Sequence, residues 1–463
     1  MPTRLLSEWA SRMSFDDLPP AVVEHTCLRV VDVLGLVLAG LGTPFGRAVR
    51  QAVLALNPGG PSRILGSGER TSPTGAALTN GALSQALEFD DTHNESIVHM
   101  SSPAVAEALA LAEQRPTTGR DLITAIVIGN EISCRIGSVA PGQFHRRGFH
   151  PTGLFATFGA TWLAARRLGL GVEQMICAAG IAGSFASGLL ECWVDGTQSK
   201  FLHPGWAAQS GIVAATLGGA GATGPGTILD GRFGLFQSHL QDEAAVRDFA
   251  RVTAGLGERW ESENASFKPY PAAHVIHPYI DALLTLRANH AIEPSEVASI
   301  ACPVAPYIVG IVCEPLAEKR RPRSDSHGRV SLPYTLAEAL ARGRLGRDAY
   351  QPAFLSDPAI LAIADRVEYR VDPAYPGPER FKGAVEIVMR DGRSYAAIEE
   401  NNRGSAANPM SVADIVGKFD ENAADILAPD ARRRLVDAVM ALPASADAIR
   451  IVDLTLGAGA AAC

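Results

Sequence analysis

The sequence predicts a mostly α-helical protein that carries a second, α+β domain. Apolar residues with helical spacing dominate the first part of the chain, whereas β-branched residues alternate with polar ones between about residues 266 and 403. The pattern becomes helical again after this segment. We therefore expect an all-α bundle built from both chain ends, residues 1–265 and 404–463, with an α+β lid domain inserted at residues 266–403. A chain of 463 residues is long enough for two cores of this kind.

The helical segments of the first part are rich in small residues, which let helix axes approach closely. The first long helix is expected from Pro19 to Leu41, because prolines suit a first helical turn and Gly42 suits the end. Further helices are expected over residues 72–89, 102–114, 119–137, 152–170, 171–191 and 205–221. Together these segments predict an all-α bundle.

The inserted part alternates strand and helix signals. Strands are expected over residues 297–304 and 364–373 and within 383–400, where Asp391-Gly392 indicates a hairpin turn. Within this part, helices are expected over residues 277–290 and 333–345, and after it, in the returning helical segment, over residues 411–419 and 428–442. The alanine-rich tail, residues 456–463, is expected to fray.

Charge and composition exclude several classes of partner. The net charge is −8 and no run of lysine or arginine occurs, which argues against binding to nucleic acid or an anionic membrane. The most apolar run, Val33–Gly42, is too short to span a bilayer, and the first residues lack the pattern of a signal peptide. Seven scattered cysteines without a CxxC pair favour a reducing compartment, so we expect a cytoplasmic protein.

No cofactor or metal motif stands out. Walker A, HExxH, GxSxG and Cys/His metal spacings do not occur. The segment Gly219–Gly224 matches GxGxxG, but it follows a helical run instead of a strand and precedes Pro225, so we interpret it as a helix end. We expect neither a cofactor nor a metal site. A divalent metal on the Asp–His cluster described next stays an alternative.

The densest group of titratable residues follows the end of a predicted helix at Phe89. Asp90, Asp91, Thr92, His93 and His99 lie within ten residues of one another, where a loop held by a rigid scaffold commonly carries chemistry. An aspartate there can act as a base or orient a histidine, and the histidines can act as acids, bases or anion ligands. The alternative is that these residues cap helices.

Three further stretches hold candidates. His150 stands at a predicted helix start, where the positive end of the helix dipole attracts anions. Lys200 lies alone in a long stretch without other lysines, and an ammonium between apolar helices needs a carboxylate partner from a side chain or a ligand. Lys268, His274 and His277 lie at the predicted domain junction, a preferred position for a ligand cleft. The alternatives are a helix cap, a surface lysine and surface histidines.

These stretches, in order, resemble the blocks of the MmgE/PrpD family over nearly the whole chain. The blocks are "NGALSQALEFDDTH", "RRGFHPTGLFATFGA", "SKFLHPGWAAQSGIVAATL", "KPYPAAHVIHPYIDA", "VSLPYTLAEAL" and "NPMSVADIVGKF". The resemblance implies an all-α domain from both chain ends with an inserted α+β lid. It also implies a homodimer without a cofactor that dehydrates, decarboxylates or epimerises a small carboxylate.

The resemblance assigns the family's site residues to positions of this sequence. The residues expected to be catalytic are Asp91, His99, His150 and His274. The residues expected to bind substrate are Asp90, Thr92, Lys200, Lys268 and Tyr334, together with His93 from the same cluster.

The expected reaction is that of a lyase of the dehydratase type, which removes a proton next to a carboxylate of a small di- or tricarboxylate. Lys200 and Lys268 would bind the carboxylates, because cations offset the cost of a carbanion. His99 or His150 would move the proton, with Asp91 fixing the tautomer, and His274 would serve as a second acid. An epimerase of an iminodisuccinate-like dicarboxylate and a carboxylate-binding protein without turnover stay open as alternatives.

Overall fold

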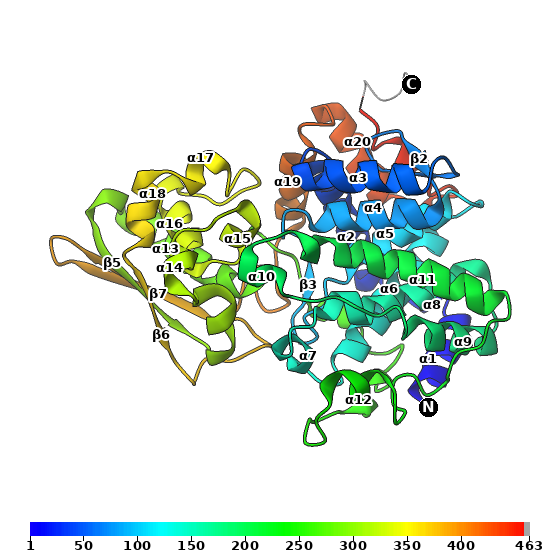
Figure 1. Ribbon diagram of the computed structural model, residues 1–463. Helices are drawn as coiled ribbons and strands as arrows, with labels where there is room; N and C mark the ends of the chain where they lie inside the picture. Colours follow the sequence, from blue (N-terminus) through cyan, green and yellow to red (C-terminus); the bar gives the residue numbers. More distant parts are fainter. Residues whose placement is uncertain (458–463) are drawn as a thin grey trace.

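The computed structural model describes residues 1–457 and divides visibly into a large helical part and a smaller α+β part (Figure 1). The described ends of the chain both belong to the helical part, and the yellow-green to light-orange segments that carry β5, β6 and β7 form the α+β part (Figure 1). The predicted fold class, mostly α with an α+β second domain, is therefore confirmed. The numbered domain boundaries stay a prediction. Residues 458–463 of the tail expected to fray lie outside the described residues.

The helical part contains most of the long helices, and all but the first and third of those named next lie near their predicted positions. They are α1 (Pro2–Arg12), α2 (Pro20–Leu41), α3 (Pro44–Leu56), α4 (Pro73–Gln85), α5 (Ser101–Ala112), α6 (Gly119–Gly137), α8 (Thr157–Leu168), α9 (Val172–Ala182), α11 (His203–Gly219), α19 (Val412–Ala423) and α20 (Pro429–Met440). Small residues bring α4 and α11 into backbone contact, because a Cβ on Gly81 would lie 2.7 Å from the Cα of Gly205. In residues 1–457, no single helix is both long enough and apolar enough to cross a membrane. Only α2 and α3 taken together meet the length and hydropathy criteria, and they are bent by 89° relative to each other.

Two separate hydrophobic cores hold the two parts. The larger core takes buried residues from Leu6 to Ala265 and again from Phe419 to Val452, so both ends of the chain share it. The smaller core takes buried residues from Tyr270 to Met389. The returning helix α19 packs directly on α2, which brings the end of the chain close to its beginning.

The α+β part is built on one four-stranded sheet with the order β6-β5-β7-β8. The strands are β5 (Val297–Val304), β6 (Val367–Val371), β7 (Gly383–Met389) and β8 (Ser394–Glu399). β5 and β6 are parallel, which requires the long helical crossover between them, and the other pairs are antiparallel. Helices α13 (His277–His290) and α16 (Leu332–Arg342) pack with this sheet.

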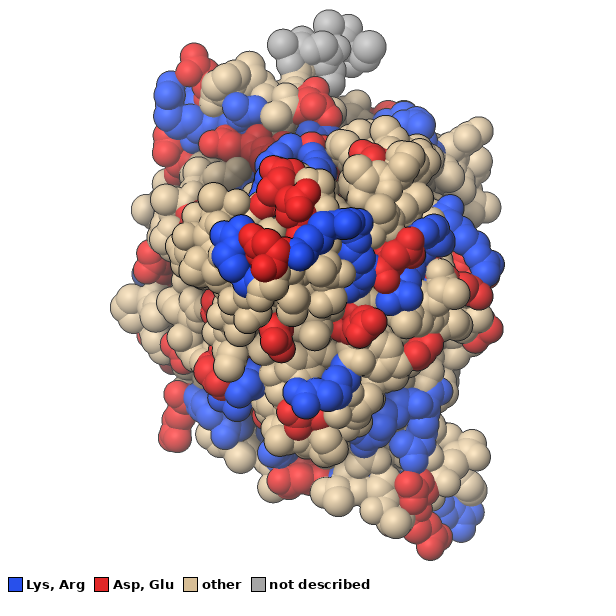
Figure 2. Space-filling model, turned by 90° about the vertical axis from the view of Figure 1, so that its left-hand side faces the viewer, with Lys and Arg blue, Asp and Glu red and all other residues tan. Residues whose placement is uncertain are grey.

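The surface of the α+β part mixes charges of both signs. Figure 2 shows lysine and arginine side chains interspersed with aspartate and glutamate over the face that this part presents. Opposite charges this close largely cancel at a distance. This face therefore presents no extended patch of positive charge that could select a small anion.

Candidate functional site

A tight turn folds the predicted polar cluster into a compact group. After α4 ends at Gln85, the chain bends through Glu88, whose φ of +53° lies in the left-handed region. Strand β3 (Thr92–His93) follows and pairs with β4 (Ala265–Ser266) at the junction with the α+β part. The His93 N–H donates to the Val98 carbonyl at 2.8 Å, so the chain turns back and places His99 beside Thr92.

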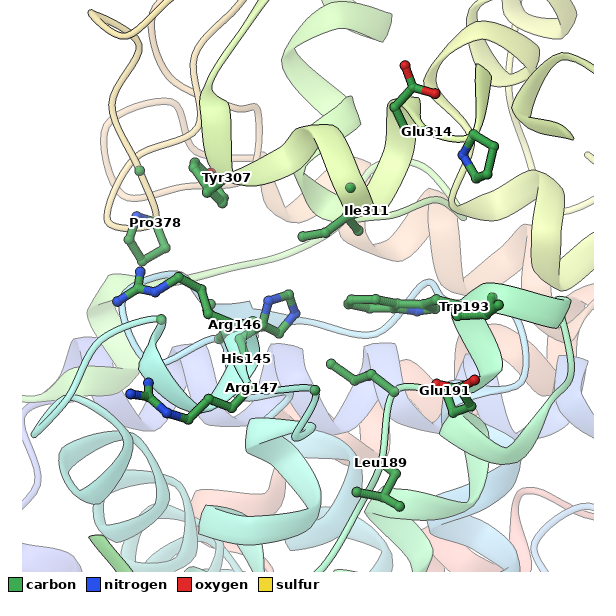
Figure 3. A pocket seen from close by; sticks show the side chains of 18 of the residues that line it. His145, Arg146, Arg147, Leu189, Glu191, Trp193, Tyr307, Ile311, Glu314 and Pro378 are labelled. Atoms are coloured by element: carbon green, nitrogen blue, oxygen red, sulfur yellow. The ribbon is translucent and has the colours of Figure 1, made fainter. Parts of the chain in front are cut away.

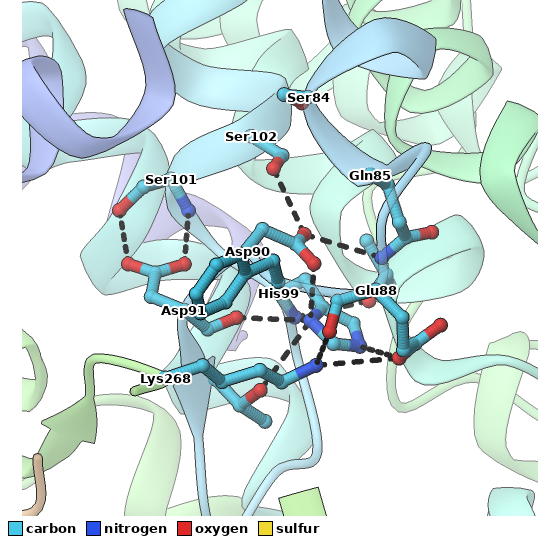
Figure 4. A network of polar contacts seen from close by, with 12 residues as sticks. Ser84, Gln85, Glu88, Asp90, Asp91, His99, Ser101, Ser102 and Lys268 are labelled. Carbon is cyan, nitrogen blue, oxygen red and sulfur yellow. Dashed lines mark hydrogen bonds and ion pairs between the residues drawn. The ribbon is translucent and has the colours of Figure 1, made fainter. Parts of the chain in front are cut away.

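The His99 imidazole is held by oxygen atoms on its Nδ1 side (Figure 4). Nδ1 lies 2.9 Å from the Asp91 carbonyl oxygen and 3.3 Å from both Oδ1 of Asp90 and Oγ1 of Thr92. Burial alone would raise the pKa of Asp90, but the neighbouring His99 lowers this pKa below its usual value. Nε2 is left to face the cavity side of the site, where Lys200 Nζ lies 3.5 Å away.

The Asp91 carboxylate faces away from His99, contrary to the tautomer-fixing role expected for it. Its Oδ2 pairs with Nη1 of Arg29 at 2.6 Å, and its Oδ1 accepts the Ser101 N–H at 3.2 Å, at the start of α5. The carboxylate next to the imidazole belongs to Asp90 instead. The sequence pattern did not indicate this because Arg29 lies 62 positions earlier in the chain.

Lys200 and Lys268, from distant segments, share one carboxylate that the sequence analysis missed. Both Glu88 oxygens lie 2.7 Å from Nζ of Lys200, and Glu88 Oε1 lies 3.3 Å from Nζ of Lys268. Burial opposes the charge on Glu88, but the two ammonium groups outweigh it and hold the pKa of Glu88 far below its usual value. Burial lowers the pKa of Lys268, and Glu88 counteracts this. The sequence carried one general signal for such a residue, because a buried lysine needs a carboxylate partner, but it did not identify Glu88.

Two further histidines lie near the lysines. His150 stands just before the π-helical turn η2 (Thr152–Ala156), its ring 5.5 Å from that of His99 and its Nδ1 2.8 Å from Nδ1 of His203. His274 contacts the amide nitrogen of Asn402 through Nε2 at 2.9 Å. The pKa of His150 is well below its usual value because of burial and Lys200, and that of His274 because of burial, His277 and Lys268.

These residues surround a small cavity between the two parts of the molecule. Its volume is about 60 Å³, and the polar and charged side chains on its wall include Glu88, Thr92, His99, His145, His150, Lys200, Lys268 and His274. A wider vestibule of about 790 Å³ lies outside it (Figure 3). Six residues line both spaces and so form the neck between them: Ile97, His145, Trp193, Tyr307, Ile311 and Pro378.

Four predicted site residues are absent from the cavity wall: Asp90 and Asp91, whose contacts are given above, and His93 and Tyr334. His93 is buried, and its ring nitrogens contact Ser96 Oγ at 2.8 Å and Glu261 Oε2 at 3.2 Å. Tyr334 is buried in the core of the α+β part, its ring 6.1 Å from that of Tyr350. His93 and Tyr334 therefore make their contacts with residues other than the lysines and histidines of the cavity.

The neck residues His145, Trp193 and Tyr307 are the other members of the site that sequence reasoning missed. His145 comes from the short helix α7 (Gln143–Arg146) and Trp193 from α10 (Cys192–Asp195). Their rings lie 5.1 Å apart, and burial with nearby Lys200 lowers the pKa of His145 to about 4. In residues 1–457, no group of three or more His, Cys, Asp and Glu side chains is arranged to hold a metal ion.

Two features characterise this protein. A helical part is joined to an α+β part, and buried lysines and histidines lie where the two parts meet. Two family models match the chain, the MmgE/PrpD N-terminal domain over residues 4–247 and the MmgE/PrpD C-terminal domain over residues 270–442. The chain therefore belongs to the MmgE/PrpD family.

Several characterised proteins are similar over almost the whole chain. The cis-aconitate decarboxylase-like protein oryM of Aspergillus oryzae is 25% identical over 473 residues, which cover 98% of this chain and 97% of that protein. Cis-aconitate decarboxylase of Aspergillus terreus is 27% identical over 481 residues, 98% of this chain and 95% of the relative. Cis-aconitate decarboxylase of Mus musculus is 25% identical over 438 residues, 92% and 88% of the two chains.

Proposed function

We propose that this protein is a lyase that decarboxylates a small unsaturated tricarboxylate of the cis-aconitate type. The observation that carries the proposal is the pair of buried lysines, Lys200 and Lys268, in the wall of a cavity that four histidines also line. The similarity to cis-aconitate decarboxylases supports the reaction class.

The reaction needs a stabilised carbanion and one proton. A carboxylate on the methylene carbon leaves as carbon dioxide, and the electrons of the broken C–C bond form a new double bond. The electrons of the original double bond move to the carbon next to another carboxylate, and one proton is taken up there. The trianion and one proton thus give carbon dioxide and a dianion. Cations near the remaining carboxylates lower the energy of the intermediate.

The side chains around the cavity suit these tasks. Lys200 and Lys268 bind the carboxylates that stay on the substrate, and burial strengthens these contacts. His99 is the proposed proton donor, because among the four cavity histidines it is the one with carboxylate oxygens of Asp90 and Glu88 within 3.9 Å. His150 and His274 have lowered pKa values, so near neutral pH they serve as uncharged hydrogen-bonding partners.

Two other outcomes need a similar site. Elimination of water, the reaction expected from the sequence, requires a hydroxylated substrate and a group that protonates the leaving hydroxyl. Epimerisation requires acid/base groups on opposite faces of one carbon. The relatives' names favour decarboxylation over both, and one experiment separates the three.

The experiment is proton NMR of the protein with cis-aconitate, citrate and an amino-substituted dicarboxylate in deuterated water. We expect cis-aconitate to lose carbon dioxide and to gain one deuterium at the new methylene carbon. Loss of water from citrate, or exchange of deuterium into the amino compound without loss of a group, would select the alternatives.

Lys200→Ala and His99→Ala should each lower the rate of turnover at least about 100-fold, equivalent to about 2.7 kcal/mol of barrier. Full rates in both folded variants would contradict the assigned site.

A further inference from the structure

Three consecutive backbone carbonyls beside the cavity each accept a hydrogen bond from a buried cationic side chain. Nη1 of Arg329 donates to Leu87 at 2.8 Å, Nζ of Lys268 to Glu88 at 3.0 Å and Nζ of Lys418 to Phe89 at 2.7 Å. The three cations come from the α+β part, the junction and the returning helix α19. We call the bend Leu87–Phe89 and these three donors the carbonyl clamp.

The bend needs such support because its backbone is in an unfavourable conformation. Glu88 has a φ of +53°, which residues other than glycine rarely adopt, and the bend lies outside the helices and strands. Hydrogen bonds from charged donors are stronger than those between neutral groups, most of all when buried. The left-handed conformation at Glu88 turns its side chain to the two lysines while its own carbonyl stays bound.

We propose that Lys418 is a positioning residue of the active site, which acts through Phe89 and Glu88 without touching the substrate. Lys418 is absent from the cavity wall, yet its Nζ lies 4.1 Å from the centre of the Phe89 ring and bonds the Phe89 carbonyl. By fixing the residue next to Glu88, it holds the Glu88 carboxylate between Lys200 and Lys268. The inference rests on the proposed function of that site.

The variants must separate the clamp from the ion pair that Lys418 also makes. Its Nζ lies 2.7 Å from Oδ1 of the buried Asp32, so removing the lysine alone would leave a buried charge. The test variant is therefore Asp32→Asn/Lys418→Met, and Asp32→Asn alone removes only the ion pair. Lys319→Met is the matched control for hydrogen exchange, because Lys319 is a buried lysine that is absent from the cavity wall and donates to the Val330 carbonyl at 2.8 Å, outside the bend Leu87–Phe89. Asp32→Asn/Lys418→Gln replaces the test variant if that one does not fold.

Two readouts are compared with the wild type: kcat and KM for cis-aconitate, and hydrogen exchange of the peptide that covers residues 87–92. We expect the double variant to lower kcat at least tenfold and to speed exchange in this peptide at least tenfold. Asp32→Asn should change neither by more than about threefold, and Lys319→Met should keep exchange of this peptide within about threefold of wild type, whatever they do to thermal stability.

Unchanged exchange and an unchanged kcat in the folded double variant would overturn the role of Lys418, and so would equal effects in Asp32→Asn alone. If the wild-type protein does not turn over cis-aconitate, the proposed function fails. The exchange comparison still decides whether Lys418 holds the bend, so the two failures are distinguishable.

Discussion

At the scale of single residues, Glu88 decides how the lysine pair can receive a substrate. Two buried ammonium groups without a counter-charge would be costly, and one shared carboxylate leaves an excess of one positive charge for a ligand. Glu88 therefore stabilises the positive charges of the lysine pair without cancelling both of them. The other charged or titratable groups that bear on it are His99, Asp90, Arg329, His277 and Cys192.

Replacing Glu88 with glutamine should change the pH profile of turnover. Burial lowers the pKa of Lys268 below its usual value and Glu88 opposes this, so Glu88→Gln lowers that pKa further. A lysine must be protonated to bind a carboxylate, and activity is lost as pH rises through its pKa. We expect the alkaline limb of kcat/KM to move at least one pH unit lower in Glu88→Gln.

The control for that measurement is Glu107→Gln, which alters another fully buried glutamate, one that is absent from the cavity wall. It should leave the profile of kcat/KM unchanged. If the alkaline limb of kcat/KM in Glu88→Gln lies at the same pH as in the wild type, Glu88 does not maintain the charge of Lys268.

At the scale of elements, the sequence predicted the residue range of a helix or strand well where the segment is stabilised by its own periodicity and caps. Helix α13 (His277–His290) and strand β5 (Val297–Val304) occupy the expected residues. The helix expected over residues 171–191 ends at Ala182 instead, because residues 188–190 extend and bond the backbone of Gly148 and His150. The Met389 N–H bonds the Arg393 carbonyl, so the predicted hairpin turn has three residues, with Gly392 at a φ of +88°.

The site was predictable to the extent that its residues carry their own signals. Lys200, Lys268 and His150 stood out by type and position, and the structure brings them to one cavity. The partners of Asp91 and Glu88 depend on segments more than 60 positions away in the chain, Arg29 and Lys200, which no local pattern reveals. Such pairings are set by how helices pack, a property of the whole fold.

Helix α5 contains a buried acid that should cost stability at neutral pH. Neither oxygen of Glu107 has a hydrogen-bond partner in the described chain, and burial holds the pKa of Glu107 well above its usual value. The unfolded chain releases this proton above about pH 4.5 while the folded protein keeps it, so stability falls as pH rises. Glu107→Gln removes this loss.

We therefore expect the advantage of Glu107→Gln over wild type in urea unfolding to grow between pH 5 and pH 7, by up to about 1.4 kcal/mol per pH unit. Glu8→Gln on α1, at a partly exposed position, should match wild type at both pH values. An advantage for Glu107→Gln that is equal at pH 5 and pH 7 would exclude this ionisation as the cause.

At the scale of the whole molecule, the two parts must separate slightly to admit a substrate. The inner cavity of about 60 Å³ is far below the roughly 300–1,000 Å³ usual for ligand sites, whereas the vestibule of about 790 Å³ falls within that range. The neck between them has walls from both parts, with Trp193 and His145 on one side and Tyr307 and Ile311 on the other (Figure 3). Widening the cavity therefore requires movement at the neck.

Trp193 should report this movement through its fluorescence. Its indole lies against His145 in the neck, so a ligand that widens the cavity changes its surroundings. We expect titration with cis-aconitate to change the tryptophan emission of the wild type, and Trp193→Phe to abolish at least about 80% of that change. Ligand binding by calorimetry should persist, since one partly buried aromatic can be replaced by another at modest cost. Trp206→Phe, on the outer face of α11 and 40% exposed, is the matched control and should keep the full response. A response that survives in Trp193→Phe and disappears in Trp206→Phe would place the ligand-induced change outside the neck, and the cavity would then have to fill without the two parts moving there.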